Sequence, residues 1–336
     1  MPEKISVLGA GSWGIAIANQ LHANGHKINL WEFNRSDCEY LAANRVHEKK
    51  LPGIVIPNEI NITNDLEQAL GDTAYTVMAV PAQKVRAVCA EIDIIDNHGG
   101  KYINLAKGVE IGTLLRMSEV IDGTIKSSDM SRIATLTGPS HAEEVARGIP
   151  TSVVVASADY DFAREIQELF NNISFRVYRS NDLVGAELGG SLKNVIAIAS
   201  GITQGLDYGD NTTGALLTRG LAEITRMGVK AGADPLTFAG LSGIGDLITT
   251  CVSRHSRNRH VGERIGKGET LREILDSMVM VAEGVDTCRS AYAMAEKFDV
   301  DMPITVEVHK VLFEDKPPRK ALTDLMGRQL KEEIWS

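Results

Sequence analysis

One lysine, Lys193, interrupts an otherwise uncharged stretch that runs from Leu188 to Ala199. An ammonium group held in a partly desolvated cleft loses affinity for its proton, because burial disfavours the charged form, and its pKa moves toward neutral pH. Such a group can exchange a proton with an alcohol oxygen. The alternative is a lysine whose stem packs on the apolar run while its ammonium group reaches water. Asp246, which follows a glycine-rich turn, is either a helix cap or a carboxylate that faces and orients Lys193.

A basic cluster lies between Ser253 and His260, where three arginines and two histidines fall within eight residues. The planar guanidinium group of arginine matches a phosphate monoester, and Ser256 and Asn258 add neutral donors. A solvated charged loop and a nucleic-acid patch are the alternatives. Because the chain as a whole carries a formal net charge of −9, an isolated cluster of this kind favours a small phosphorylated ligand and argues against nucleic acid.

Two further polar residues fall where predicted parallel strands end, and ligands of open α/β sheets bind beyond those ends. Lys107 follows the strand-like run Tyr102–Ala106, so its ammonium group is placed to reach a carbonyl or a phosphate, unless it is simply one of many solvated lysines. Ser140 follows the run Arg132–Thr137. It is either the N-cap of the helical segment 142–146 or part of a helix start that receives an anion.

The glycines Gly9, Gly11 and Gly14 stand between the apolar run Ile5–Leu8 and the helical pattern Ile15–Asn24. The first glycine permits a tight turn from strand to helix, the second lets the backbone approach a pyrophosphate, and the third lets the helix pack on the strand. The anion is then left at the helix N-terminus. Three glycines alone are a weak signal, but the strand before them, the helix after them and a second strand over residues 27–31 predict a dinucleotide site.

The choice between NAD and NADP is left open by the residues that follow the second strand. A carboxylate at that point bonds the ribose hydroxyl groups of NAD, whereas a nearby arginine accommodates the 2′-phosphate of NADP. Glu32 and Arg35 both lie there and point to opposite preferences. NAD or NADP is therefore the expected cofactor.

Short strand-like runs alternate with helical patterns in the first half of the chain, which predicts a Rossmann-type, doubly wound parallel sheet. From about residue 188 onward the apolar runs favour helices alone. We therefore expect a dinucleotide-binding domain over residues 1–188 and an all-helical domain over residues 189–336. The expected later strands are 75–80, 102–106, 132–137, 152–156 and 174–178, a helix is expected over 112–120, and residues 316–319 are expected to be a solvent-facing linker.

The composition excludes several classes of protein. With 336 residues, 43% hydrophobic and 24% charged, the chain is ordinary for a globular protein. The cysteines Cys38, Cys89, Cys251 and Cys288 are far apart, which favours reduced thiols and a cytoplasmic location. No apolar run is long enough for a membrane span, and no histidine spacing indicates a metal site, so neither is expected.

Taken together and in order, these motifs resemble those of the NAD(P)-dependent glycerol-3-phosphate dehydrogenase family over nearly the whole chain. The motifs that carry the resemblance are residues 7–14, 106–108, 137–140, 189–194, 243–247 and 256–259. The resemblance implies a helical domain of the 6-phosphogluconate-dehydrogenase type after the Rossmann-type domain. It also implies an oxidoreductase that interconverts dihydroxyacetone phosphate and sn-glycerol 3-phosphate by hydride transfer and so feeds glycerophospholipid biosynthesis.

The resemblance further implies roles for individual residues, with Lys193 as the general acid and base. The substrate site implied in this way consists of Lys107, Gly138, Ser140, Lys193, Asp246, Ser256, Arg257 and Asn258, and Thr250, four residues after Asp246, is expected to join it. The expected cofactor contacts are the glycines Gly9, Gly11 and Gly14, with Ser12, Trp13, Phe33, Lys107, Ala142, Arg257, Val281 and Glu283. The family often has a small residue where this chain has Glu32, and a basic or polar one where it has Phe33.

Two rival functions remain at this point. One is an enzyme of the same architecture that acts on a hydroxy acid such as 6-phosphogluconate, against which the cluster Ser256–Asn258 argues. The other is a non-catalytic sensor of the reduced cofactor, which would have no use for Lys193. We also expect a homodimer.

Overall fold

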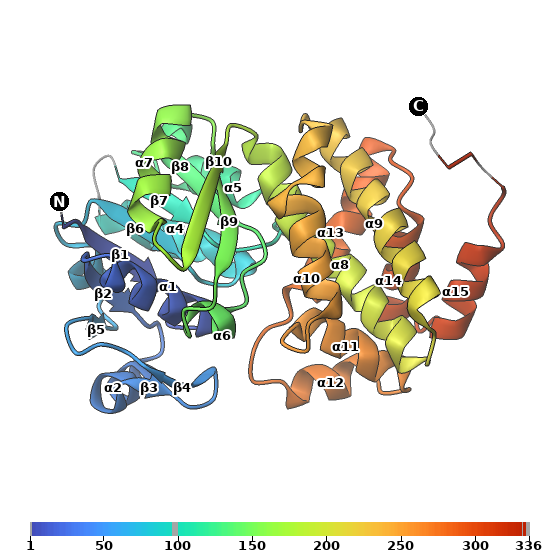
Figure 1. The fold of residues 1–336 in the computed structure, drawn as a ribbon, viewed down its shortest axis with the longest axis horizontal. Coiled ribbons are helices and arrows are strands. Elements are labelled where there is room, and N and C mark those ends of the chain that lie inside the picture. Colours follow the sequence, from blue (N-terminus) through green and yellow to red (C-terminus); the bar gives the residue numbers. More distant parts are fainter. Residues whose placement is uncertain (1, 96–99, 331, 334–336) are drawn as a thin grey trace.

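The computed structural model describes residues 2–95, 100–330 and 332–333, and it consists of an α/β unit followed by a helical unit (Figure 1). In this described part of the chain, every strand lies before residue 181, and the elements after it are helices. The expected fold class, a Rossmann-type sheet followed by an all-helical region, is therefore confirmed.

The α/β unit is built on an eight-stranded sheet with the order β10-β9-β8-β7-β6-β1-β2-β5. The strands are β1 (Lys4–Leu8), β2 (Lys27–Trp31), β5 (Asn61–Thr63), β6 (Tyr75–Met78), β7 (Lys101–Asn104), β8 (Ile133–Thr137), β9 (Thr151–Ser157) and β10 (Phe175–Ser180). From β1 the chain extends the sheet one way through β2 and then the other way through β6, and both neighbours are parallel to β1. Ligands bind at such a switch point, and the glycine loop follows β1 there.

The sheet is mixed, and the expectation of a fully parallel sheet was wrong at one edge. β9 runs antiparallel to β8, and β10 runs parallel to β9. The connection from β8 to β9 contains only α6 (Ala142–Val145), whose four residues span about 6 Å. Because β9 is antiparallel to β8, the connection 138–150 does not return along β8 and begins and ends at the same edge of the sheet. The loop 138–141 therefore stays at the edge of the sheet where the glycine loop lies.

Helices cover the sheet, and a small hairpin near α2 forms a separate two-stranded sheet. The hairpin pairs β3 (Val46–His47) with β4 (Leu51–Val55), and no sequence pattern predicted it. The buried Leu51 and Ile56 anchor the hairpin in the core of the α/β unit. The helices are α1 (Ser12–Ala23), α2 (Arg35–Asn44), α3 (Leu66–Leu70), α4 (Val85–Ile95), α5 (Met117–Thr124), α6 and α7 (Tyr160–Phe170).

The helix expected over residues 112–120 begins later, at Met117. Residues 109–116 instead form a closed loop, in which Val109 and Arg116 make an isolated bridge and Leu114 adopts a positive φ of 62°. The backbone N–H of Arg116 donates to the Glu119 carboxylate at 2.9 Å and so starts the helix. A left-handed residue inside the apolar pattern explains why periodicity alone placed the start too early.

The helical unit is arranged around α8 (Leu183–Gly205), which lies in its middle in Figure 1. A helix buried on all sides is apolar on all sides, which accounts for the long uncharged run in the sequence. Glu187 and Lys193 are the charged side chains of α8, and both are buried. The surrounding helices are α9 (Asp210–Lys230), α10 (Asp246–Val252), α11 (Arg257–Gly266), α12 (Leu271–Ser277), α13 (Glu283–Phe298), α14 (Pro303–Phe313) and α15 (Pro318–Met326).

Glycines allow the backbones of α8 and α11 to come into close contact where the two helices cross. A Cβ atom at Gly262 of α11 would lie 2.0 Å from the backbone oxygen of Ile198, and one at Gly201 of α8 would lie 2.0 Å from the backbone oxygen of Arg259. These neighbours are backbone atoms, so no side chain can rotate away. The crossing places the start of α11, with its basic cluster, beside the middle of α8.

We expect Gly262→Ala to destabilise the protein by about 1 to 3 kcal/mol, because overpacking forces the two helix backbones apart. Chemical denaturation measures this loss. The matched control is Gly214→Ala in α9, where a Cβ atom would meet nothing within 4 Å. There alanine should stabilise by up to about 1 kcal/mol through its helix propensity. Equal effects at the two sites would show that the close crossing does not govern stability.

The expected linker at residues 316–319 is instead part of the packed structure. The Lys316 ammonium group pairs with Asp324 at 2.8 Å and also contacts Glu307, and α15 already begins at Pro318. The prolines that suggested a linker stand at the start of that helix, where a missing N–H is tolerated. Among the described residues, no helix combines the length and the apolar character that crossing a membrane requires.

Candidate active site

A cavity of about 420 Å³ is lined by residues of both units. The α/β unit contributes the glycine loop, the ends of β2, β6 and β7, and the segment 140–143. The helical unit contributes residues of α8, α10 and α11 and the segment 279–283. The predicted dinucleotide site and Lys193 therefore line one cavity.

The glycine loop has the shape that a pyrophosphate requires. Gly9 has a φ of 114°, which a residue with a side chain rarely adopts, and a Cβ atom at Gly14 would lie 1.8 Å from the backbone oxygen of Gly9. A Cβ atom at Gly11 would meet nothing within 4 Å, so packing does not require this glycine, and its open space faces the cavity. Helix α1 starts here with no side-chain cap and no acidic residue in its first turn. Its free N–H groups suit an anion, so the loop fits a dinucleotide.

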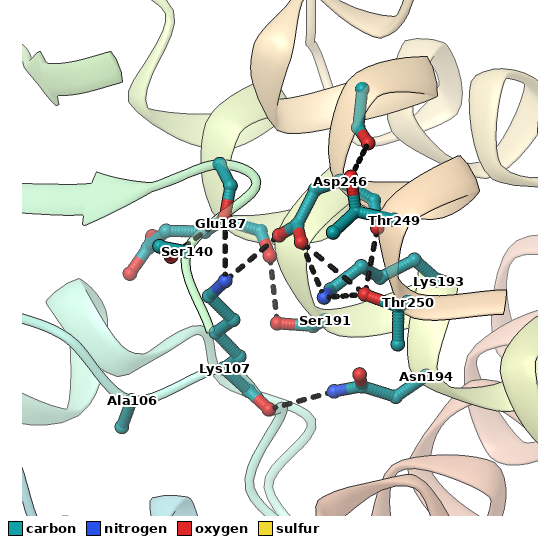
Figure 2. Close-up of polar contacts among 12 residues, drawn as sticks. Ala106, Lys107, Ser140, Glu187, Ser191, Lys193, Asn194, Asp246, Thr249 and Thr250 are labelled. Carbon is teal, nitrogen blue, oxygen red and sulfur yellow. Dashed lines mark hydrogen bonds and ion pairs between the residues drawn. The ribbon is translucent and has the colours of Figure 1, made fainter. Parts of the chain in front are cut away.

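Lys193 lines the same cavity and is almost entirely enclosed, with 4% of its surface exposed. Its Nζ atom donates to Asp246 Oδ1 at 2.6 Å and to Thr250 Oγ1 (Figure 2). Burial lowers the pKa of Lys193 to about 8, although Asp246 acts in the opposite direction. The alternative of a lysine that reaches bulk water is therefore wrong. The arrangement gives an ammonium group that can release its proton near neutral pH.

Asp246 holds two lysines at once. Figure 2 shows the ammonium groups of Lys107 and Lys193 pointing at its carboxylate, one from a loop of the α/β unit and one from α8. Lys107 Nζ lies 2.9 Å from Asp246 Oδ2. Burial raises the pKa of Asp246, but the two lysines outweigh it and the pKa is lowered, so the group is a carboxylate. Asp246 thus faces Lys193, as one of its two interpretations predicted, and it starts α10 as well.

Each of the two ammonium groups has one N–H left for a ligand. A lysine ammonium has three donors. Lys107 directs two of them to Gly138 O, at 3.0 Å, and to Asp246, and Lys193 directs two to Asp246 and Thr250. Because both lysines line the cavity, the remaining donors are available to an oxygen atom placed between them. Asp246 and Gly138 themselves are not among the residues that line the cavity, and they act by holding the lysines.

The loop after β8 adds Ser140 to the cavity wall. Its hydroxyl donates to Gly138 O at 2.8 Å, the same carbonyl that accepts from Lys107. Gly138 has a φ of 129°, and this conformation turns its carbonyl into the site. His141 caps α6 by its backbone position, so the prediction of Ser140 as the N-cap was wrong by one residue.

The basic cluster leads into the start of α11, and only some of its residues line the cavity. Ser256 is the N-cap, with its hydroxyl accepting from the backbone N–H of Arg259 at 3.2 Å. Arg257 lines the cavity and donates from Nη1 to Val281 O at 2.8 Å. Asn258 is buried and donates to Asn194 Oδ1 at 2.9 Å. Ser256, Arg257 and Asn258 therefore meet the cavity, whereas Arg254 and Arg259 are not part of its lining.

The remaining predicted cofactor residues belong to the same cavity or pack directly behind it. The backbone N–H of Ala82 donates to Glu283 Oε1 at 3.1 Å, and burial raises the pKa of Glu283 to about 7. The residues of this group that line the cavity are Gly9, Gly11, Ser12, Trp13, Phe33, Lys107, Ala142, Arg257, Val281 and Glu283. Gly14 lies behind them and permits the packing of α1 on β1.

Several lining residues were missed by the sequence analysis. Asn194 directly follows Lys193 and links Lys107 O to Asn258 by hydrogen bonds, at 3.4 Å and 2.9 Å. Its place next to Lys193 in the motif was a usable signal. Lys50, from the β3–β4 hairpin, and Met280 also line the cavity, and only the tertiary structure brings them there. Among the described residues, no group of three His, Cys, Asp or Glu side chains is arranged to hold a metal ion.

Comparison with known proteins agrees with this geometry over both units. Residues 4–163 match the family model described as NAD-dependent glycerol-3-phosphate dehydrogenase N-terminus, and residues 182–323 match the corresponding C-terminus model. Glycerol-3-phosphate dehydrogenase (NAD(P)+) of Thermoanaerobacter sp. (strain X514) is 49% identical over 98% of this chain and 99% of its own length. The enzyme of the same name from Fusobacterium nucleatum subsp. nucleatum is 46% identical over 99% of each chain.

A solved structure extends the likeness to three dimensions. The crystal structure of glycerol-3-phosphate dehydrogenase from Coxiella burnetii is 34% identical, covers 97% of this chain and 99% of its own, and gives a TM-score of 0.93. The match spans the sheet, the helical unit and the cavity between them. This chain therefore belongs to the NAD-dependent glycerol-3-phosphate dehydrogenase family.

Proposed function

We propose that Lys193 exchanges the proton in the reaction of this chain, which interconverts dihydroxyacetone phosphate and sn-glycerol 3-phosphate with NAD or NADP. The observation that carries this assignment is the contact of the buried Lys193 ammonium group with Asp246 and Thr250 at the cavity wall. The glycine loop would hold NAD or NADP, and the nicotinamide would supply the hydride for C2 of the ketone or accept it from C2 of the alcohol. Lys193 then exchanges a proton with the oxygen atom on C2.

In the reducing direction Lys193 donates its remaining proton to the oxygen on C2 as negative charge develops there. Lys107 offers its free N–H to the same oxygen and polarises the carbonyl group before transfer. Asp246 stays ionised between the two lysines, so it keeps Lys193 protonated until the alkoxide forms. In the oxidising direction the neutral Lys193 amine takes the hydroxyl proton.

The phosphate end of the substrate is assigned to the start of α11. Arg257 presents a planar guanidinium group to the cavity, Ser256 adds a hydroxyl group, and Ser140 adds another if its hydroxyl turns from Gly138 O to the phosphate. Asn258 holds its place through Asn194 and through the backbone N–H of Gly284, which donates to Asn258 Oδ1 at 2.9 Å. This set recognises a phosphate monoester, which a hydroxy acid without a phosphate lacks. It therefore disfavours hydroxy acids that lack a phosphate, whereas 6-phosphogluconate carries one and is distinguished by the assay below.

A spectrophotometric assay at about 340 nm, the absorbance of the reduced nicotinamide, tests the proposal directly. Purified protein is mixed with dihydroxyacetone phosphate and either NADH or NADPH. We expect oxidation of at least one reduced cofactor with dihydroxyacetone phosphate, and no reduction of NAD or NADP with 6-phosphogluconate. Cofactor binding without turnover of any phosphorylated triose would instead identify the non-catalytic sensor.

The pH dependence follows from the lowered pKa of Lys193, which is about 8. Reduction needs the protonated ammonium group, so kcat/KM for dihydroxyacetone phosphate should fall as pH rises through about 8. Oxidation of glycerol 3-phosphate needs the neutral amine, so its kcat/KM should rise over the same range. Asp246→Asn removes the carboxylate that favours the ammonium form and should move both midpoints to lower pH. A profile that is flat between about pH 7 and 9 would remove Lys193 from proton transfer.

Other parts of the expected biology belong to the proposal as well. We propose a role in glycerophospholipid synthesis on the basis of family membership, and a cytoplasmic location on the basis of four free, buried cysteines. The homodimer and the absence of nucleic-acid binding stay predictions, the latter supported by the net charge of −9. The division of the chain after residue 188 falls inside α8, and we propose that this helix belongs to both functional parts.

A further inference from the structure

We propose that Lys50 is the residue through which this chain accepts the 2′-phosphate of NADP, while Glu32 favours the free ribose hydroxyl groups of NAD. The inference rests on the cofactor site proposed above and adds to it the group that discriminates between the two cofactors. Glu32, Phe33 and Lys50 line the same cavity as the glycine loop. Glu32 and Phe33 directly follow β2, and Lys50 lies between β3 and β4 of the hairpin.

Glu32 lies at the point where the second strand of a dinucleotide-binding unit normally meets the adenosine ribose. It directly follows β2 and is buried. The backbone N–H of Asn34 donates to Glu32 Oε1 at 3.0 Å, which fixes the carboxylate. The other carboxylate oxygen can accept hydrogen bonds from a ribose. A phosphate in the same position would meet a like charge, so NADP needs a compensating cation.

Arg35, the cation that the sequence suggested for this purpose, points away from the site. Its side chain is 81% exposed, and its Nε atom donates to Glu39 Oε1 at 2.9 Å along the surface of α2. Arg35 is not among the residues that line the cavity. The cation next to Glu32 must therefore come from another segment.

Lys50 supplies that cation from the β3–β4 hairpin. It directly precedes Leu51, which is buried in the core, so the base of its side chain is fixed. Asn19 of α1 donates to Val55 O at 2.9 Å and ties the hairpin to the helix that starts at the glycine loop. The Lys50 side chain is 23% exposed, and its Nζ atom lies 3.9 Å from Asp37 Oδ2.

The pairing of Lys50 with Asp37 is long, and a partly exposed pair of this kind contributes little. The ammonium group is therefore free to take a stronger partner, and a phosphate dianion carries more charge than a carboxylate. Lys50 is a flexible point charge on a four-carbon stem, which suits a ligand that is present in one cofactor and absent in the other. Glu32 and Lys50 together give a site that tolerates both cofactors.

The test is calorimetric binding of NADPH, NADH, adenosine 2′,5′-bisphosphate and adenosine 5′-monophosphate, none of which requires turnover. Lys50→Gln should weaken NADPH and the bisphosphate by about tenfold, the value of one charge-assisted contact. NADH and the monophosphate should change by less than about twofold. High salt should weaken NADPH binding to the wild type more than to the variant. Glu32→Ser should raise the affinity for NADPH relative to that for NADH, because it removes the carboxylate that repels the 2′-phosphate.

Lys49→Gln is the matched control, because Lys49 is an exposed neighbour outside the cavity lining. Arg35→Gln tests the competing assignment, in which Arg35 binds the 2′-phosphate. Both should leave the ratio of NADPH to NADH affinity unchanged. An unchanged ratio in Lys50→Gln, or an equal loss in Arg35→Gln, would overturn the role of Lys50 alone. If neither dinucleotide binds the wild type, both the proposed cofactor site and this inference are wrong.

Discussion

Replacing Lys193 with Met is expected to lower kcat by about 10²- to 10⁴-fold, the usual contribution of a positioned general acid or base. Met keeps much of the length of the side chain but has no proton to give. Asp246 still has Lys107 at 2.9 Å, so the variant does not leave a buried carboxylate without a partner. The loss should appear in kcat, while the affinity for NADH should hardly change, because Lys193 is not among the expected cofactor contacts.

Lys193→Arg separates proton transfer from simple charge. A guanidinium group stays protonated above pH 12, so it can supply positive charge but not a proton near neutral pH. We expect this variant to remain as slow as Lys193→Met. Steady-state kinetics with saturating NADH and thermal unfolding of each variant give the comparison. More than about a tenth of the wild-type kcat in the Met variant would exclude Lys193 as the proton donor.

The features that the sequence predicted correctly are those set by neighbouring residues. The glycine loop is framed by β1 and α1, and the uncharged run around Lys193 follows from the burial of α8 on all sides. Local patterns carry this information because strand and helix burial have fixed periods. The orientation of β9 escaped prediction, because the burial pattern of a strand does not encode the direction in which it pairs with its neighbour.

The contacts that make the site depend on tertiary structure and could not be predicted as contacts. Asp246 meets Lys193 across 53 residues and Lys107 across 139 residues. The sequence offered Asp246 and Lys193 as partners by residue type alone, with a helix cap as the alternative. At the cofactor end, Arg35 had the expected charge but extends along α2 toward Glu39. Lys50 has no motif around it, since its position depends on a hairpin that packs beside the cavity.

Replacing Arg257 with Ala is expected to cost about 2 to 5 kcal/mol in kcat/KM for dihydroxyacetone phosphate, as for one partner removed from a charge pair. This corresponds to a loss of roughly 30-fold to several thousandfold. Arg257 stands in the first turn of α11 and lines the cavity, where its guanidinium group can form two parallel contacts with a phosphate. Arg257→Lys should recover only part of the loss, because a point charge cannot replace the planar fork.

Arg257 also donates to Val281 O at 2.8 Å, so the substitution releases the segment that lines the cofactor side of the cavity. The affinity for NADH is therefore measured separately, and the phosphate effect is the loss that remains at saturating cofactor. Unphosphorylated dihydroxyacetone is the substrate control, since it never makes the lost contact and its slow turnover should hardly respond. Arg254→Ala is the matched variant, from the same cluster but outside the cavity lining. Equal losses for the two substrates would show that Arg257 supports the fold of the site and does not bind the phosphate.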